Sequence, residues 1–444
     1  MFTLEALSRR YLAHMPDQHR VLLLASALLF LGSCKKDKAD ELPVVRILFP
    51  AAGSTLLIPD TITVRVQAED DRLVGSVTVM LTDGNGVPIG PQAQTIVNTS
   101  STTVDLELAV TGERIESGTY TLVARVSDGD QDGFAFQDMV VQATPLRLRS
   151  VFVLPPVNAP APYPITRIDS LGDVSTWMTL SELSGAAIDL DHLFVGGTTS
   201  QGLVKVDVNT GAPTQLLTNM GVGTDPYFQG IVIDPSDARL YTGTLDGTIR
   251  GFFPTGNGSF TAQSPPGWYS EFTLVVDDQL VSAAFNPISA QRKIIGYDLL
   301  SGTLLAQYPL DNEPVTLFYR DDDHALVFGN RVGDGVVQER NIDLGGVFEM
   351  RVFPADPILA VARINQDTFI IARTSGLFRF TYVSNSVTFI SSLAATALAY
   401  DKVSGAILVG IGNQLVTMDP FNGNVLDSRT LPTAIGSILL LTNR

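Results

Sequence analysis

The chain has 444 residues, 46 acidic and 29 basic side chains, and a formal net charge of −17, so its length exceeds one ordinary core and suits two domains behind a leader. The acidic balance disfavours nucleic acid as a partner, because its phosphate groups would be repelled. One cysteine excludes an intramolecular disulfide, and four histidines disfavour His-rich metal sites and Ser-His-Asp hydrolysis.

An apolar run at residues 21–32 (VLLLASALLFLG) follows the basic side chains of Arg9, Arg10 and Arg20. With about twelve residues it is too short to span a bilayer as a helix and has the length of a signal-peptide core. The sequence therefore predicts a signal peptide over residues 1–33. A translation start at Met15 instead of Met1 stays open.

The four residues Leu31-Gly32-Ser33-Cys34 come directly after this run and resemble the lipobox of bacterial lipoproteins. The resemblance implies cleavage before Cys34 and a lipid anchor on its thiol, with the bilayer as a partner through acyl chains such as palmitate. Lys35 stands where lipoproteins of the inner membrane often have aspartate, so the outer membrane is expected, facing the periplasm or the cell surface. Residues 34–43 are expected to form a solvated tether. The alternative is an uncleaved anchor with a chance cysteine.

Residues 44–145 alternate apolar and polar side chains in short runs separated by turn signals such as Asp83–Gly86. Period-two alternation with one apolar face predicts strands of a β-sandwich. About seven strands in about 100 residues resemble an immunoglobulin-like module. Gly118-Thr119-Tyr120 resembles the tyrosine corner of such modules, which implies a hydrogen bond from the Tyr120 hydroxyl to nearby backbone.

Asp128, Asp130 and Asp132 have the D-x-D-x-D-G spacing of a calcium loop. An EF-hand would place glutamate at the twelfth position, where this chain has Met139. A hairpin turn rich in Asp and Gly explains the same residues. Calcium is therefore the one cofactor that the sequence raises, beside a purely structural turn.

Residues 146–444 repeat a strand that runs into an Asp- and Gly-rich turn, at intervals of about 37 to 46 residues. Seven copies predict a seven-bladed β-propeller, and the pattern resembles the YVTN, WD40-like and quinoprotein-like propeller superfamily. One strand, 436–441, is left over at the end, and the first blade near Ser150 lacks an inner strand, so this strand is expected to close the ring. The repeated turns lie at Asp169, Asp207, Phe253, Asp298, Asp343, Tyr382 and Asp419.

The longest expected loops, 218–229, 262–271 and 283–292, join second to third strands or one blade to the next. Uneven loops on a regular scaffold commonly carry binding, and aromatic and arginine side chains are enriched at hot spots. The arginines favour an anionic or carbohydrate-like ligand, whereas packing of the aromatics inside the blades is the alternative. The candidate ligand-binding residues are Tyr227, Phe228, Trp268, Tyr269, Phe285, Arg292, Arg331 and Arg373.

His192 and His324 each follow an acidic turn that repeats along the chain, so a structural role is expected for both. No GxSxG, HExxH, P-loop or CxxC pattern is present. The favoured interpretation is a non-enzymatic binding or scaffold lipoprotein of the cell envelope, with an unknown protein or glycan on the propeller. An enzyme of the lactonase or lyase kind is the alternative, and it would need three or more carboxylates or imidazoles that converge on the propeller's channel.

Overall fold

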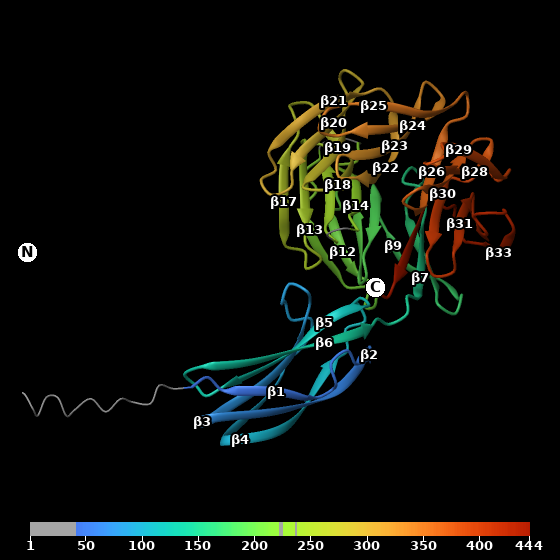
Figure 1. Ribbon diagram of the computed structural model, residues 1–444. Helices are drawn as coiled ribbons and strands as arrows, with labels where there is room; N and C mark the ends of the chain where they lie inside the picture. Colours follow the sequence, from blue (N-terminus) through green and yellow to red (C-terminus); the bar gives the residue numbers. More distant parts are fainter. Residues whose placement is uncertain (1–40, 222–224, 236–237) are drawn as a thin grey trace, which may run out of the picture. The chain divides into compact units, whose positions relative to one another are not determined.

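The computed structural model describes residues 41–221, 225–235 and 238–444, and the regular elements in these residues are all β-strands (Figure 1). The prediction of an all-β chain is therefore confirmed. Two compact units divide between Thr144 and Pro145. The expected signal peptide, the lipidation site Cys34 and most of the tether lie outside the described residues.

The first unit is an Ig-like sandwich whose longest strand takes part in two sets of pairings. Residues 65–69 of this strand pair with the strand Val44–Phe49, whereas its residues 76–82 pair with the strand Gly118–Ser127. Two runs that the sequence presents as separate strands, at Ile62–Ala68 and Val77–Leu81, are thus one strand. The strand order is β1-β3-β5-β6-β2, with β4 paired to β3. The strands are β1 (Val44–Phe49), β2 (Thr55–Leu57), β3 (Asp60–Thr82), β4 (Ala93–Val110), β5 (Gly118–Ser127) and β6 (Asp132–Gln142).

The core of this unit consists of the alternating side chains that the period-two pattern predicted, among them Val64, Val66, Val77 and Val79, all fully buried. The Tyr120 hydroxyl donates a hydrogen bond of 3.0 Å to the carbonyl oxygen of Glu116. The local geometry of a tyrosine corner is therefore present.

The second unit is a propeller of seven four-stranded antiparallel sheets, here called blades 1 to 7. In blades 2 to 7 the chain runs from the innermost to the outermost strand. Blade 1 comprises β34 (Ser437–Thr442), β7 (Leu148–Leu154), β8 (Tyr163–Asp169) and β9 (Val174–Leu180); blade 2 comprises β10 (Gly185–Ile188), β11 (His192–Gly196), β12 (Leu203–Asp207) and β13 (Pro213–Leu217); blade 3 comprises β14 (Phe228–Ile233), β15 (Leu240–Thr244), β16 (Thr248–Phe252) and β17 (Gly258–Gln263).

The remaining four blades repeat this order. Blade 4 comprises β18 (Tyr269–Val276), β19 (Gln279–Asn286), β20 (Gln291–Asp298) and β21 (Leu304–Leu310); blade 5 comprises β22 (Glu313–Asp321), β23 (His324–Arg331), β24 (Asp334–Asn341) and β25 (Val347–Phe353). Blade 6 comprises β26 (Ile358–Asn365), β27 (Thr368–Arg373), β28 (Gly376–Thr381) and β29 (Ser386–Ser391); blade 7 comprises β30 (Ala397–Asp401), β31 (Ala406–Ile411), β32 (Gln414–Met418) and β33 (Val425–Thr430).

The repeated Asp- and Gly-rich turn has a local cause, and so does a small residue near the end of a second strand. In the turn after the third strand, the Asp207 carboxylate accepts hydrogen bonds from the backbone N–H groups of Asn209 and Thr210, and Gly211 adopts φ +72°. Glycine near the end of a second strand leaves room for backbone that passes close by. A Cβ on Gly329 would lie only 2.5 Å from the carbonyl oxygen of Glu313, at the start of the innermost strand of the same blade.

The C-terminal strand β34 pairs with β7 and supplies the innermost strand of blade 1. Ile438 lies opposite Val153, and Leu440 lies opposite Val151. Leu441 is fully buried in a cluster with Phe152 of blade 1 and Leu193 of blade 2. The prediction that the last strand closes the ring is confirmed.

Ring closure predicts a large stability cost for changes in β34. Leu441→Ala should lower the free energy of unfolding by about 2–4 kcal/mol, because the cavity lies between two blades. The matched control is Leu300→Ala at a residue 98% exposed, which should change stability by less than about 0.5 kcal/mol. Deletion of residues 435–444 should lower the melting temperature of the propeller more than either substitution, as followed by circular dichroism. A deletion variant that melts like the parent would show that the ring closes in another way.

Candidate functional site

One end of the propeller, here called the linker face, consists of the second-to-third-strand turns and the blade-to-blade linkers. Both loop sets emerge at this end because consecutive strands of a blade run antiparallel. The loops are shorter than the sequence suggested. The linker between β17 and β18 covers only 264–268, and the turn between β19 and β20 covers 287–290. In the third expected loop, 218–229, residues 222–224 lie outside the described part.

Three of the candidate aromatic residues contribute mainly to packing inside the blades. Tyr227 and Phe228 are buried and contact each other edge to face, and the Tyr227 hydroxyl donates to Asp246 at 3.0 Å. Trp268 is buried in a cluster with Tyr241 and Tyr297. Little of these ring surfaces is open to a partner.

Arg373 is also enclosed. Its guanidinium carbon lies 3.5 Å from the ring centroid of Phe378 in its own blade and 4.1 Å from that of Phe353 in blade 5. Its Nη1 lies 2.9 Å from an oxygen of Asp356 in the linker between the two blades. The side chain therefore joins blades 5 and 6 and presents little surface to a ligand.

An open pocket of about 470 Å³ lies on the linker face between blades 4 and 5. It is bounded by the β19–β20 turn, the β21–β22 linker and the β23–β24 turn. Two candidate residues, Arg292 and Arg331, lie in its wall, and the other candidates do not line it. The lining residues are 290–293, 309–313 and 330–332.

The two arginines of the pocket are held by carboxylates. Arg292 donates from Nε to Glu271 at 2.9 Å and stacks over the ring of Phe285, whose centroid lies 4.4 Å away. Phe285 in turn contacts Tyr269 on the neighbouring strand edge to face. This arrangement joins three of the candidate residues in blade 4, of which only Arg292 lines the pocket.

On the side of blade 5, Arg331 donates to Asp311 and to Glu349, both at 2.7 Å. The buried Arg340 adds a contact of 3.0 Å to Asp311. Burial acts to raise the pKa of Asp311, but hydrogen bonds from Gln338 and Arg331 outweigh it and hold this pKa below its usual value. The Asp311 carboxylate is therefore ionised at neutral pH.

Sequence reasoning missed the carboxylates of this site, namely Glu271, Asp311, Glu313 and Glu349. Glu271 and Glu349 lie 21 and 18 residues from the arginines that they bind, in each case with one strand of the same blade between the two. For Asp311 and Glu313, the only indication in the sequence is that both lie in the acidic segment Asp311-Asn312-Glu313.

Carboxylates also attach linkers to the turn of the next blade elsewhere on this face. Glu182, between blades 1 and 2, accepts hydrogen bonds from the backbone N–H and hydroxyl groups of Thr199 and Ser200. Asp356 accepts from Thr374 and Ser375 of blade 6 in the same way. Burial acts to raise the pKa of Glu182, but these hydrogen bonds outweigh it and hold the pKa far below its ordinary value.

A pKa lowered by folding means that ionised Glu182 stabilises the folded state at neutral pH, and that this contribution is lost as pH falls from about 4.5 through the folded pKa. Glu182→Gln should therefore lower the free energy of unfolding by about 1–2 kcal/mol at pH 7. The difference from the parent should shrink below about pH 4.5. Urea denaturation at pH 7, 4 and 3 measures it, with the exposed Glu116→Gln as control. A difference that stays constant across this range would contradict the assignment.

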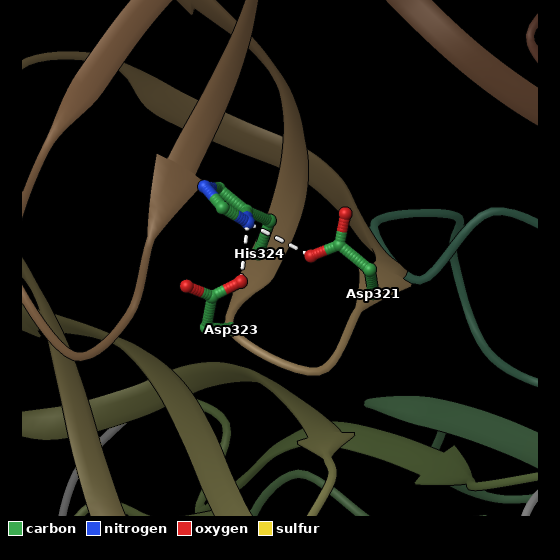
Figure 2. Close-up of side chains that lie close together, drawn as sticks. All are labelled: Asp321, Asp323 and His324. Carbon is green, nitrogen blue, oxygen red and sulfur yellow. Dashed lines mark hydrogen bonds and ion pairs between the residues drawn. The ribbon is translucent and has the colours of Figure 1, made fainter.

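A second cluster, Asp321, Asp323 and His324, lies at the opposite end of blade 5, on the hairpin between β22 and β23 (Figure 2). Its potential ligand atoms lie within 4.8 Å of one another, and it is the one such group of three in the described ranges. His324 Nδ1 lies 2.8 Å from an oxygen of Asp321 and 2.6 Å from an oxygen of Asp323.

The neighbouring amide of Asn341 is bound to this cluster. Its Oδ1 accepts the backbone N–H of Leu344 at 2.6 Å, so Nδ2 points to Asp323 at 2.8 Å and to His324 Nε2 at 3.3 Å. Burial acts to lower the pKa of His324, but the hydrogen bond to Asp321 and the charges of Asp321 and Asp323 outweigh it and hold this pKa above its ordinary value. These contacts are those of an acidic hairpin turn. His192 repeats the contact in blade 2, with Nδ1 3.4 Å from Asp189.

The calcium hypothesis concerns Asp128, Asp130 and Asp132 in the first unit. Asp128 Oδ1 accepts the backbone N–H groups of Asp130 and Gln131, both at 2.6 Å. Asp130 lies 3.7 Å from Arg72, and Asp132 lies 2.8 Å from Arg125. The three carboxylates do not belong to a converging group in the described part of the chain. Their contacts are those of a hairpin turn with two ion pairs.

Comparison with protein-family models gives a match in the first unit. Residues 43–124 match the family model of the bacterial Ig domain. No curated protein matches the sequence significantly. No helix in the described residues is long and apolar enough to cross a membrane.

Three solved structures resemble the chain at low identity. A quinonprotein alcohol dehydrogenase-like protein from Bacteroides thetaiotaomicron is 13% identical, with 89% of this chain and 99% of that chain covered and a TM-score of 0.45. BamB from Moraxella catarrhalis is 17% identical, with 55% and 72% covered and a TM-score of 0.39. A chain of the mitotic checkpoint complex is 12% identical, with 58% and 84% covered and a TM-score of 0.45.

Proposed function

We propose that the chain is a lipid-anchored, non-enzymatic binding protein of the bacterial envelope, whose propeller holds a partner on the linker face. The observation that carries the binding role is the open pocket between blades 4 and 5. Its volume lies in the range that ligands or inserted side chains of a partner occupy. The match of residues 43–124 to a bacterial Ig domain supports an envelope protein.

The anchor rests on the N-terminal sequence alone. An apolar core of signal-peptide length ends directly in Leu31-Gly32-Ser33-Cys34. Several acyl chains on Cys34 would hold the protein stably, because each buried CH₂ group contributes about 0.8 kcal/mol. The outer membrane is the proposed location, since Lys35 rather than aspartate follows the cysteine.

Cys34→Ala should abolish incorporation of labelled palmitate, because the thiol that accepts the lipid is lost. The variant should accumulate as an unlipidated precursor in the cell fraction. Ser33→Ala keeps a small residue before the cysteine and should be labelled like the parent. Palmitate labelling that persists in Cys34→Ala would refute the anchor.

The linker face can be tested by filling its pocket. Ala290 lines the pocket, and Ala355 occupies a turn with almost the same backbone conformation outside it, at φ 54° and 53°. Ala290→Trp should reduce the recovery of a partner from envelope extract at least tenfold, whereas Ala355→Trp should not. Both variants should melt like the parent. If each recovers the partner as well as the parent does, the binding site lies elsewhere.

A further inference from the structure

The arginines of the pocket between blades 4 and 5 suggest a positively charged site. The charges that this pocket exposes to solvent are mainly negative. Four cations and four anions lie in or directly behind its wall, so their sum is close to zero. The sign of the field at the mouth therefore depends on which of these charges are exposed. The eight are Arg292, Lys293, Arg331 and Arg340 with Glu271, Asp311, Glu313 and Glu349.

The exposed charges are mainly carboxylates. The side chain of Glu313 is 68% exposed and that of Asp311 is 50% exposed. Those of Arg292 and Arg331 are 18% and 32% exposed. The acidic oxygens therefore reach solvent further than the guanidinium groups.

The cations are also committed to other contacts. The two arginines donate to Glu271, Asp311 and Glu349, and the Lys293 ammonium lies 4.6 Å from the ring centroid of Trp268 and donates to Gln307 at 3.0 Å. Among the described residues, the ion pair of Glu313 is with Arg292 at 3.7 Å, and Arg292 already binds Glu271 more closely. Glu313 thus remains the least neutralised charge of the pocket.

An apolar side chain lies at the edge of the pocket on the side of blade 5. Val332 lines the pocket in the turn of this blade, and its side chain is almost completely exposed. Ile288 is also almost completely exposed and lies in the same turn of blade 4 as the lining residue Ala290. Val332 also has φ 53°, in the left-handed region that β-branched residues rarely adopt.

We infer that this pocket receives a lysine or arginine side chain of a protein partner, with the aliphatic rim against the stem of that side chain and its apolar neighbours. This inference rests on the proposed function and names the occupant of the same site. A basic side chain has the two parts that the pocket matches, an apolar stem and a cationic end. The end would complete a charge-assisted hydrogen bond with Glu313. The acidic chain, with net charge −17, would attract such a partner over longer distances.

The test uses the full chain, labelled at isoleucine and valine methyl groups, and short peptides as probes. Acetyl-Val-Arg-Val-amide should shift the methyl resonances of Ile288 and Val332 at low salt. The matched citrulline peptide, which lacks the charge, should bind about tenfold more weakly, and Glu313→Gln should weaken the arginine peptide to a similar extent. The exposed Glu116→Gln is the control and should leave binding unchanged. Salt at about 0.5 M should weaken the arginine peptide most.

Several results would overturn the inference. Equal binding of the arginine and citrulline peptides would remove the role of the charge, and so would unchanged binding by Glu313→Gln. Shifts at Ile288 and Val332 with acetyl-Val-Glu-Val-amide or with diacetylchitobiose, but not with the arginine peptide, would assign an anionic or a sugar ligand instead. Absence of shifts with every probe would also refute the basic side chain as occupant.

The same variants separate this inference from the proposed function. If Ala290→Trp abolishes recovery of the envelope partner while Glu313→Gln preserves it, the linker face binds but the occupant is not cationic. If Ala290→Trp has no effect on recovery, the proposed binding face itself is wrong.

Discussion

The propeller depends on one constraint: a four-stranded blade has two apolar faces and buries them only between two neighbours. Blade 1 meets this constraint with strands from both ends of the domain, since β34 pairs with β7. Leu441 contributes to a core that also contains residues of blade 2, so the last strand stabilises more than its own sheet. The linker face depends on this closure, because its turns and linkers come from neighbouring blades, and the closed ring fixes the positions of these blades.

Carboxylates then fix the linkers on this scaffold. Glu182 and Asp356 each accept several hydrogen bonds from the turn of the following blade, and Asp311 binds Arg331, Arg340 and Gln338 of blade 5. The pKa of each of these three carboxyls is lowered, so the bonds are fully formed at neutral pH. Of these linkers, the one with Asp311 bounds the pocket, and fixing it on blade 5 before a partner arrives reduces the entropy lost on binding.

Repeat spacing predicted the propeller well because each mark has a local cause that recurs in every blade. Asp207 and Gly211 shape a turn by themselves, and the spare strand at 436–441 had one unpaired place to occupy. The number of strands in the sandwich was predicted less well, since alternation does not reveal that β3 continues through Asp70–Leu73. For the site, residue type identified Arg292 and Arg331, but their carboxylate partners depend on strand register and linker packing, which no sequence spacing encodes.

The two ends of blade 5 show why residue type alone does not define chemistry. Asp321, Asp323 and His324 have the composition of a metal or catalytic site, yet their side chains are bound to one another and to the amide of Asn341 within a hairpin turn. At the opposite end, Arg292 and Arg331 suggest an anion site, yet both guanidinium groups bind carboxylates of the same propeller. In both places the hydrogen bonds and ion pairs that each group already makes determine which charge remains available to a partner. At the pocket that charge is the carboxylate of Glu313, which is 68% exposed.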